Sequence, residues 1–228
     1  MLSFTEENYL KALVQLTVFE ADSSEVGVNK LASSMSVKPA TVSDMVRKLK
    51  EKELVHYEKY GKISLTKSGQ LKGMMVIRRH RLWETFLTSK LDFSWDEVHE
   101  IAEELEHIHS DKLINQLDAF LGFPEFDPHG DAIPNKEGEI LIPFRKTLSE
   151  VEIGKTCYVI AVKDNAEFLK YMDQIELAIK DKVEITHREK FDQLTTITFK
   201  GKEVVVSPKL TENIFVVCSD CSKAKCSC

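Results

Sequence analysis

The chain has 228 residues, enough for one large domain or two to three small ones, and its 43% hydrophobic and 30% charged residues are ordinary for a globular protein. No apolar run approaches the roughly 18 residues that a membrane-spanning helix needs, and the first residues lack the basic start and apolar core of a signal peptide. Four of the five cysteines fall at 218 or later, which is no disulfide framework. These features predict a cytoplasmic protein without a membrane segment.

The net charge of −6 hides two segments of opposite charge. From Lys38 to Arg81 there are 12 Lys and Arg against 4 Asp and Glu, a balance of +8. From Leu91 to Gly154 there are 4 against 16, a balance of −12. A basic block followed by an acidic one indicates one face for a polyanion and another for cations.

The first third of the chain predicts a winged helix. We expect a helix over 5–19 with Thr5 as its N-cap, then helices over 28–34 and 39–52, the last with Pro39 in its first turn. Two short strands, 54–58 and 62–66, follow as a hairpin. A helix-turn-helix followed by a wing places its second helix in the DNA major groove and its wing on the phosphate backbone.

The expected DNA contacts follow from this arrangement, although some winged helices bind protein or serve only as structure. The start and outer side of the second helix, together with basic residues of the helix and wing, supply them. The predicted contacts are Lys38, Pro39, Ala40, Thr41, Ser43, Asp44, Arg47, Lys48, Lys50, Lys59 and Lys62.

A second pattern combines histidines and carboxylates at helical spacing. One helix from about Gly69 carries a pair four residues apart, and another, after a break at 92–96, carries four such residues within an arc of roughly 100°. Imidazole and carboxylate together suit a divalent transition metal. The alternative is an acidic surface helix with scattered histidines. The residues are His80, Glu84, His99, Glu103, Glu106 and His107.

A third helix after Ser110 places Leu113, Ile114, Leu117 and Leu121 on one face, which is either core or a dimer seam. We favour the seam, because paired half-sites suit a DNA-binding dimer. The stretch 124–143 reads as a loop or linker. Beyond it, alternating strands over 157–162, 183–186, 195–199 and 204–206, with one helix over 165–175, predict a small antiparallel barrel.

The last residues form a cysteine-rich tail. Its close thiols could form a site for Zn²⁺ or another soft metal. The alternative, which the short spacing favours, is a flexible tail with incidental thiols. The tail cysteines are Cys218, Cys221, Cys226 and Cys228.

Taken together, these segments resemble the metal-dependent repressors of the diphtheria toxin repressor family, which includes the manganese transport regulators. The resemblance rests on the winged helix, on RRHRLWETFL (78–87), VHEIAEELEHIHSD (98–111) and PHGDAIP (128–134), and on a C-terminal part similar to FeoA-like barrels. It implies a mainly α-helical N-terminal two-thirds followed by a small all-β domain. The implied boundaries are 1–72 for the winged helix, 73–143 for metal binding and dimerisation, 144–217 for the barrel and 218–228 for the tail.

The resemblance also implies metal ligands. The ancillary site would be His80, Glu84 and His99. The primary site would be Glu103, Glu106 and His107 with Asn8, and Asp164 and Glu167 would be further ligands from the barrel. Glu103 stands where iron-type members have a cysteine, which favours a harder ion. Lys11 stands where manganese regulators use a glutamate ligand.

The function implied is a repressor, not an enzyme, that senses Mn²⁺ or Fe²⁺, with Zn²⁺ able to bind in vitro, and controls metal-uptake genes. Its partners would be an operator in double-stranded DNA and a second copy of the chain. Two alternatives stay open. One is a winged-helix regulator of an organic ligand, with the His/Glu faces structural. The other is a metalloenzyme, although no Gly-rich phosphate loop or hydrolase motif is present and a winged helix would be unexplained.

Overall fold

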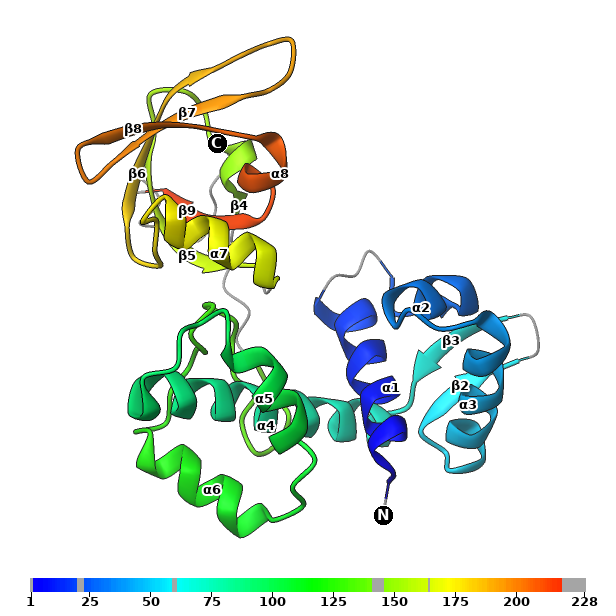
Figure 1. Ribbon diagram of the computed structural model, residues 1–228. Helices are drawn as coiled ribbons and strands as arrows, with labels where there is room; N and C mark the ends of the chain where they lie inside the picture. The colour runs from blue at the N-terminus through cyan, green and yellow to red at the C-terminus, as the bar shows by residue number, and fades with distance from the viewer. Residues whose placement is uncertain (1, 20–22, 59–60, 141–145, 164, 219–228) are drawn as a thin grey trace. The chain divides into compact units, whose positions relative to one another are not determined.

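The computed structural model describes residues 2–19, 23–58, 61–140, 146–163 and 165–218 (Figure 1). It divides into two compact units, of which the first comprises 1–86, 100–125 and 133–141 and the second 87–99, 126–132 and 142–228. The elements up to the C-terminal sheet are α1 (Phe4–Val14), a π-helical turn (Gln15–Phe19), β1 (Val26–Gly27), α2 (Val28–Ser34), α3 (Pro39–Glu51), β2 (Val55–Tyr57), β3 (Lys62–Leu65), α4 (Lys67–Leu91), α5 (Val98–Leu105) and α6 (Asp111–Phe120).

Helix α1 begins at Phe4, and its N-cap lies two residues before the predicted one. Its cap is Ser3, whose Oγ accepts from the Glu6 backbone N at 3.3 Å while Glu6 Oε2 accepts from the Ser3 backbone N at 2.9 Å. This reciprocal pair is a capping box. The prediction of Thr5 as N-cap is therefore wrong. The Ser-x-x-Glu pattern of Ser3 and Glu6 provides acceptors for two backbone N–H groups at the start of the helix.

The winged helix has its own core, and β2 and β3 lie beside α3 in Figure 1. The wing is a three-stranded sheet of order β1-β3-β2, in which Tyr57 and Val26 both pair with Ile63. Helix α3 starts at Pro39, as predicted, because proline's fixed φ suits the first helical position. The fully buried core side chains include Leu10, Leu13, Leu31, Val42, Val46, Leu49 and Ile63.

The segments 69–87 and 99–107 differ from the predicted helices in length. α4 is one continuous helix as far as Leu91, whereas α5 ends at Leu105. Glu106 and His107 therefore lie in a turn beyond α5, so the predicted single helical face for all four residues is wrong. The stripe on α6 is also divided: Ile114 and Leu117 pack into a buried cluster, while Leu113 is 40% exposed.

The second unit is built on a six-stranded antiparallel sheet of order β4-β9-β5-β6-β7-β8. Side chains from this sheet and α7 bury a core around Val159, Ile185 and Ile197. Closure into a barrel is not confirmed, because β4 and β8 are the edges of the sheet among the described residues. The elements are β4 (Lys146–Thr147), a 3₁₀ turn (Leu148–Glu150), β5 (Thr156–Val162), α7 (Ala166–Gln174), β6 (Lys182–Arg188), β7 (Thr195–Phe199), β8 (Lys202–Val206), α8 (Pro208–Thr211) and β9 (Ile214–Cys218).

The loop 126–132 belongs to this second unit. The His129 carbonyl accepts from the Val162 backbone N at 2.9 Å, and His129 Nε2 lies 2.9 Å from the Trp95 carbonyl. Gly130 has φ +84°, and a Cβ there would meet the Ile160 carbonyl at 2.1 Å. The glycine thus permits a close approach of loop and strand that no other residue allows.

Candidate metal centre and DNA-binding face

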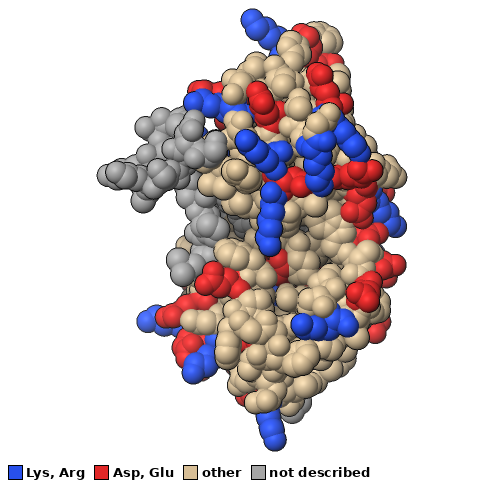
Figure 2. All heavy atoms as spheres, turned by 90° about the vertical axis from the view of Figure 1, so that its left-hand side faces the viewer, with Lys and Arg blue, Asp and Glu red and all other residues tan. Residues whose placement is uncertain are grey.

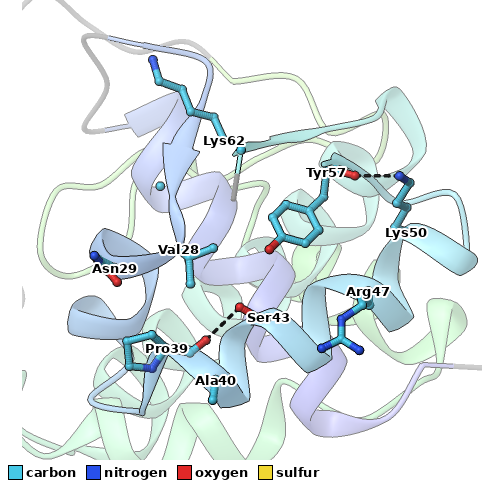
Figure 3. Close-up of a pocket in the computed structure, with 11 residues that line it drawn as sticks. Val28, Asn29, Pro39, Ala40, Ser43, Arg47, Lys50, Tyr57 and Lys62 are labelled. Carbon is cyan, nitrogen blue, oxygen red and sulfur yellow. Dashed lines mark hydrogen bonds between the residues drawn. The ribbon is translucent and has the colours of Figure 1, made fainter. Parts of the chain in front are cut away.

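Helix α3, the start of α2 and the wing border a depression of about 940 Å³ (Figure 3). Three of its lining side chains are basic and none is acidic. Lys50 Nζ donates to the Tyr57 carbonyl at 2.7 Å, which links α3 to the wing. A concave basic surface beside an exposed helix is suited to a phosphate backbone. The lining residues are Gly27, Val28, Asn29, Pro39, Ala40, Ser43, Arg47, Lys50, Tyr57, Gly61 and Lys62.

The predicted DNA contacts lie on or around this depression. Six of them line it: Pro39, Ala40, Ser43, Arg47, Lys50 and Lys62. The others that are described, Lys38, Thr41, Asp44 and Lys48, are exposed on the same helix or at its start, and Lys59 lies outside the described residues. Gly27 and Asn29 also line it and were not predicted; Gly27 lies on the two-residue strand β1, which leaves no periodic signal, and Asn29 lies in the first turn of α2.

Arg47 is the arginine that lines the depression, and it has an acidic neighbour. Its Nη2 donates to Asp44 Oδ1 at 2.5 Å, and both side chains are about two-thirds exposed. Pairs this exposed are weak. The ion pair with Asp44 therefore leaves the Arg47 guanidinium able to move to another partner.

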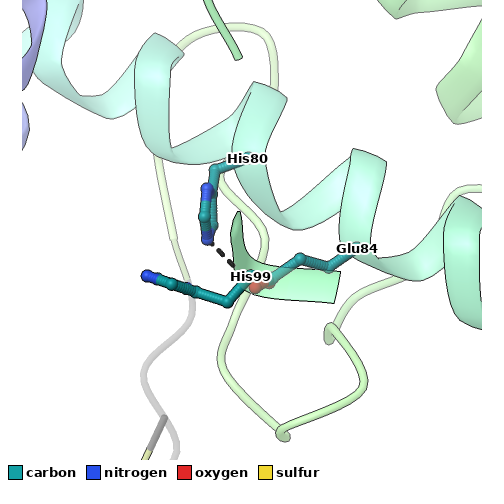
Figure 4. A group of neighbouring side chains, drawn as sticks. All are labelled: His80, Glu84 and His99. Carbon is teal, nitrogen blue, oxygen red and sulfur yellow. Dashed lines mark ion pairs between the residues drawn. The ribbon is translucent and has the colours of Figure 1, made fainter. Parts of the chain in front are cut away.

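His80, Glu84 and His99 lie together (Figure 4). Each offers a ligand atom, and these atoms all lie within 4.8 Å of one another. His80 and Glu84 are one turn apart on α4, and His80 Nε2 lies 3.0 Å from Glu84 Oε1. Two imidazoles and one carboxylate are a donor set that a divalent transition metal accepts. These residues fit a metal centre, and they are the three predicted for the ancillary site.

The second ring nitrogen of His80 has a different neighbour. Nδ1 lies 2.6 Å from Glu106 Oε2. Burial alone would lower the pKa of His80, but the negative charge of Glu84 and the hydrogen bonds to Glu106 and Glu84 outweigh it and raise that pKa. A carboxylate on the far nitrogen fixes the orientation of a metal-binding imidazole. Glu106, predicted as a ligand, is thus placed to orient one.

His107 is oriented in the same way, by a residue that sequence analysis missed. Its Nδ1 lies 2.7 Å from Glu7 Oε2, and Phe4 stacks on its ring at 4.5 Å between centroids. Glu7 is 4% exposed and also accepts from Arg79 Nη2 at 2.8 Å. Asn8, the predicted N-terminal ligand, is exposed.

The predicted primary site has a protein cation within it. Lys11 Nζ lies 2.7 Å from Glu106 Oε2 and 3.9 Å from Glu103 Oε1. Burial raises the pKa of Glu106, but the hydrogen bond from His80 and the charge of Lys11 outweigh it and hold the pKa below its usual value. With the ammonium group at these oxygens, the residues as placed do not fit a divalent ion.

The structure does not test the prediction that Asp164 and Glu167 of the C-terminal domain are metal ligands. Asp164 lies outside the described residues, and Glu167 is exposed on α7. The tail beyond Cys218 also lies outside them. No described helix has the length and apolarity needed to cross a bilayer.

Comparison with known protein families divides the chain into three matches. Residues 1–63 match the N-terminal DNA-binding domain of iron dependent repressors, and 66–135 match their metal binding and dimerisation domain. Residues 146–218 match the FeoA domain. The matches follow the order of the winged helix, the helices α4–α6 and the C-terminal sheet.

Individual relatives agree with these matches. A manganese-dependent transcriptional repressor solved in complex with manganese is 34% identical, with a TM-score of 0.85 over 93% of this chain and 99% of that chain. The diphtheria toxin repressor of Corynebacterium jeikeium is 30% identical over 134 residues, 57% of this chain and 53% of that protein. A probable metal transport system membrane protein of Chlamydia trachomatis is 45% identical over 73 residues, 32% of this chain and 16% of that protein.

This chain therefore spans about half of one curated relative and a sixth of the other, but nearly the whole of the solved repressor. Its winged helix, its His80–Glu84–His99 cluster and its C-terminal sheet occur in the order that the repressor matches require. The chain belongs to the iron-dependent (diphtheria toxin) repressor family, whose members are metal-dependent transcriptional repressors.

Proposed function

We propose that this chain represses transcription of metal-uptake genes in the cytoplasm when Mn²⁺ or Fe²⁺ binds to it. The observation that carries the proposal is the presence of the basic α3 groove and the His80–Glu84–His99 cluster in one chain. A metal bound there supplies a positive charge that joins the three side chains. The donor set lacks thiolate, which suits Mn²⁺ or Fe²⁺ better than a soft ion.

The chain's own residues would couple this site to DNA binding through α4. His80 is held from one side by Glu84 and from the other by Glu106, so its ring is oriented before any ion arrives. A metal that binds only one arrangement of α4 and α5 shifts the population toward it, by no more than its differential affinity. Because α4 begins directly after the wing, such a shift reaches the DNA-binding face.

The proposed assembly is a homodimer through α6. In the first unit, Leu113, Phe120 and Phe123 are 40%, 64% and 68% exposed. In Figure 2, at the height that α4–α6 occupy in Figure 1, uncharged side chains form most of the surface, and the acidic and basic ones gather mainly along its edges. An apolar face of this kind is buried in dimers. We expect Phe120→Glu to give monomers in sedimentation equilibrium, and Phe191→Glu, at a 95% exposed residue of the β6–β7 connection, to leave the dimer intact.

The test of the function is DNA binding to the region upstream of the protein's own gene, followed by fluorescence anisotropy. The protein is first treated with chelator and then titrated with Mn²⁺, anaerobic Fe²⁺ or Zn²⁺. We expect the ions to raise affinity at least about tenfold, which corresponds to about 1.4 kcal/mol. His99→Gln should remove that gain, and the matched control His187→Gln, on β6 and 64% exposed, should keep it.

The competing regulator of an organic ligand predicts another outcome. If the chelated protein binds DNA as tightly as the metal-loaded one, and His99→Gln changes nothing, the cluster is structural and metal sensing is refuted. DNA binding itself would then remain, carried by the α3 groove.

A further inference from the structure

Lys11 extends from α1 toward Glu103 on α5, Glu106 in the turn after α5 and His80 on α4. Its Nζ lies 2.7 Å from Glu106 Oε2, 3.2 Å from His80 Nδ1 and 3.9 Å from Glu103 Oε1. The Lys11 side chain is 21% exposed and that of Glu106 is 1% exposed. All four residues belong to the first unit.

The cluster needs a cation for physical reasons. A carboxylate as buried as that of Glu106 is costly unless it is paired and hydrogen-bonded. The ammonium group of Lys11 supplies the positive charge: it donates to Glu106 Oε2 at 2.7 Å, and the Glu103 carboxylate lies within ion-pair distance. A divalent ion on the same Glu106 oxygen would sit beside this ammonium group, and like charges at such separation repel strongly.

A second residue of α1, Glu7, makes an ion pair with the same part of the structure, but here α1 supplies the negative charge. Glu7, one helical turn before Lys11, accepts from Arg79 at 2.8 Å and lies 2.7 Å from His107 Nδ1. Residues four apart share a helix face. One face of α1 thus carries Glu7, which pairs with a basic residue, and Lys11, which pairs with an acidic one. Both residues contact α4 or the turn after α5.

We propose that the Lys11 ammonium group is the resident cation of the Glu103–Glu106–His80 cluster, where it replaces a second divalent ion and fastens α1 to α4 and α5 without metal. The metal response then depends on the His80–Glu84–His99 cluster and not on the carboxylates of Glu103 and Glu106. This consequence for DNA binding rests on the proposed function. The exclusion of metal by Lys11 is independent of the proposed function, because metal binding is measured in the absence of DNA.

The experiment counts bound Mn²⁺ by electron paramagnetic resonance of the free ion during titration of the full chain. Mn²⁺ is a hard ion that thiolates bind poorly, so the tail cysteines do not disturb the count. We expect one Mn²⁺ per subunit for the native chain. Lys11→Glu should bind two, because it removes the ammonium group and adds a carboxylate. Lys11→Arg, which keeps the charge, and Lys72→Glu, a control at an exposed lysine of α4, should each bind one.

Two results would overturn the inference: two Mn²⁺ per subunit in the native chain, or no added ion in Lys11→Glu. If the native chain binds none, the proposed metal sensing fails, while one ion gained by Lys11→Glu would still support the role of Lys11. The two proposals are therefore separable.

A second measurement covers the case in which Lys11→Glu does not fold. In chelated full-length protein, hydrogen exchange of the α1 amides should be about tenfold faster or more in Lys11→Gln than in the native chain, because Glu106 loses its counter-charge. Lys11→Arg should exchange like the native chain. Equal rates in all three proteins would refute the tether.

Discussion

Replacement of the buried Arg78 by alanine should destabilise the first unit far more than replacement of the exposed Arg47. Arg78 on α4 donates to the Pro134 carbonyl at 2.9 Å and to Asp118 on α6 at 2.7 Å. The two side chains are 6% and 14% exposed. Loss of one partner from a buried pair costs about 3–5 kcal/mol, because the other charge is left buried. Since Asp118 retains some exposure, we expect a loss of about 3 kcal/mol.

The assay is urea unfolding followed by the fluorescence of Trp83, in a Trp95→Phe background that removes the other tryptophan of the chain. Arg47→Ala is the control, because its pair with Asp44 is about two-thirds exposed and such pairs contribute only about 0–1 kcal/mol. This control should weaken DNA binding while leaving the urea midpoint nearly unchanged.

The double variant Arg78→Ala with Asp118→Ala adds a second check. It removes both charges, so it should lose less than the sum of the two single losses, with a coupling of about 1–3 kcal/mol. If Arg78→Ala costs no more than Arg47→Ala, or if the two losses add without coupling, the reasoning from burial is refuted.

Three further predictions concern single positions. Ser3→Ala should cost about 1 kcal/mol of unfolding free energy through loss of the capping box, and Thr5→Ala within about 0.5 kcal/mol, both read from urea midpoints; equal losses would contradict Ser3 as the cap. Gly69→Ala should lower the urea midpoint sharply, because a Cβ there would lie 1.9 Å from the Leu54 carbonyl; a native midpoint would contradict that contact. Burial raises the pKa of Cys157 to about 12, so its thiol should resist alkylation at about pH 8 until denaturant is added, as mass spectrometry would show. Because the pKa of this thiol is lower in the unfolded chain, stability should also fall as pH rises above that lower value; rapid alkylation of the native thiol would contradict its burial.

The parts of the fold that were predictable are those that a local pattern encodes. The winged helix follows from a proline at the first position of α3 and from two short strands at hairpin spacing. The pair His80 and Glu84 follows from a spacing of four on a helix that is continuous in the structure. Each of these depends on contacts between residues close in sequence, which periodicity reports.

Glu7 could have been found from the sequence. The apolar stripe of α1 contains Leu10, Leu13 and Val14, all fully buried. Counting back three residues from Leu10 reaches Glu7, so the same periodicity places this acid on the buried face. Its position in the first turn offered a simpler explanation, interaction with the helix dipole. The periodicity was the stronger signal, because a buried acid requires a partner.

Strand β9 was missed for a different reason. It pairs with both β5 and β4 and lies inside the sheet, and its last residue, Cys218, is the first cysteine of the predicted tail, whose composition drew attention away from the strand. Its pairing with β5 joins Val162 to Ile214, a contact between residues far apart in sequence. Periodicity indicates a strand but says nothing of which strand it joins, so neither the order of the sheet nor its open edges followed from the sequence.

The Lys11 tether sets how large the metal response must be at the remaining site. A shift of a two-state protein from 1:99 to 99:1 needs about 5.5 kcal/mol of differential binding. If α1 is already fastened through Lys11 and Glu7, the metal-free chain starts closer to the DNA-competent state. The two equivalent metal sites of a dimer then need to supply less differential binding free energy to complete the shift. A fixed ammonium group in place of a second ion thus reduces the difference in DNA affinity between the metal-free and the metal-loaded protein. Lys11→Gln should widen that range by lowering metal-free affinity, and an unchanged metal-free affinity would show that the tether does not reach the DNA-binding face.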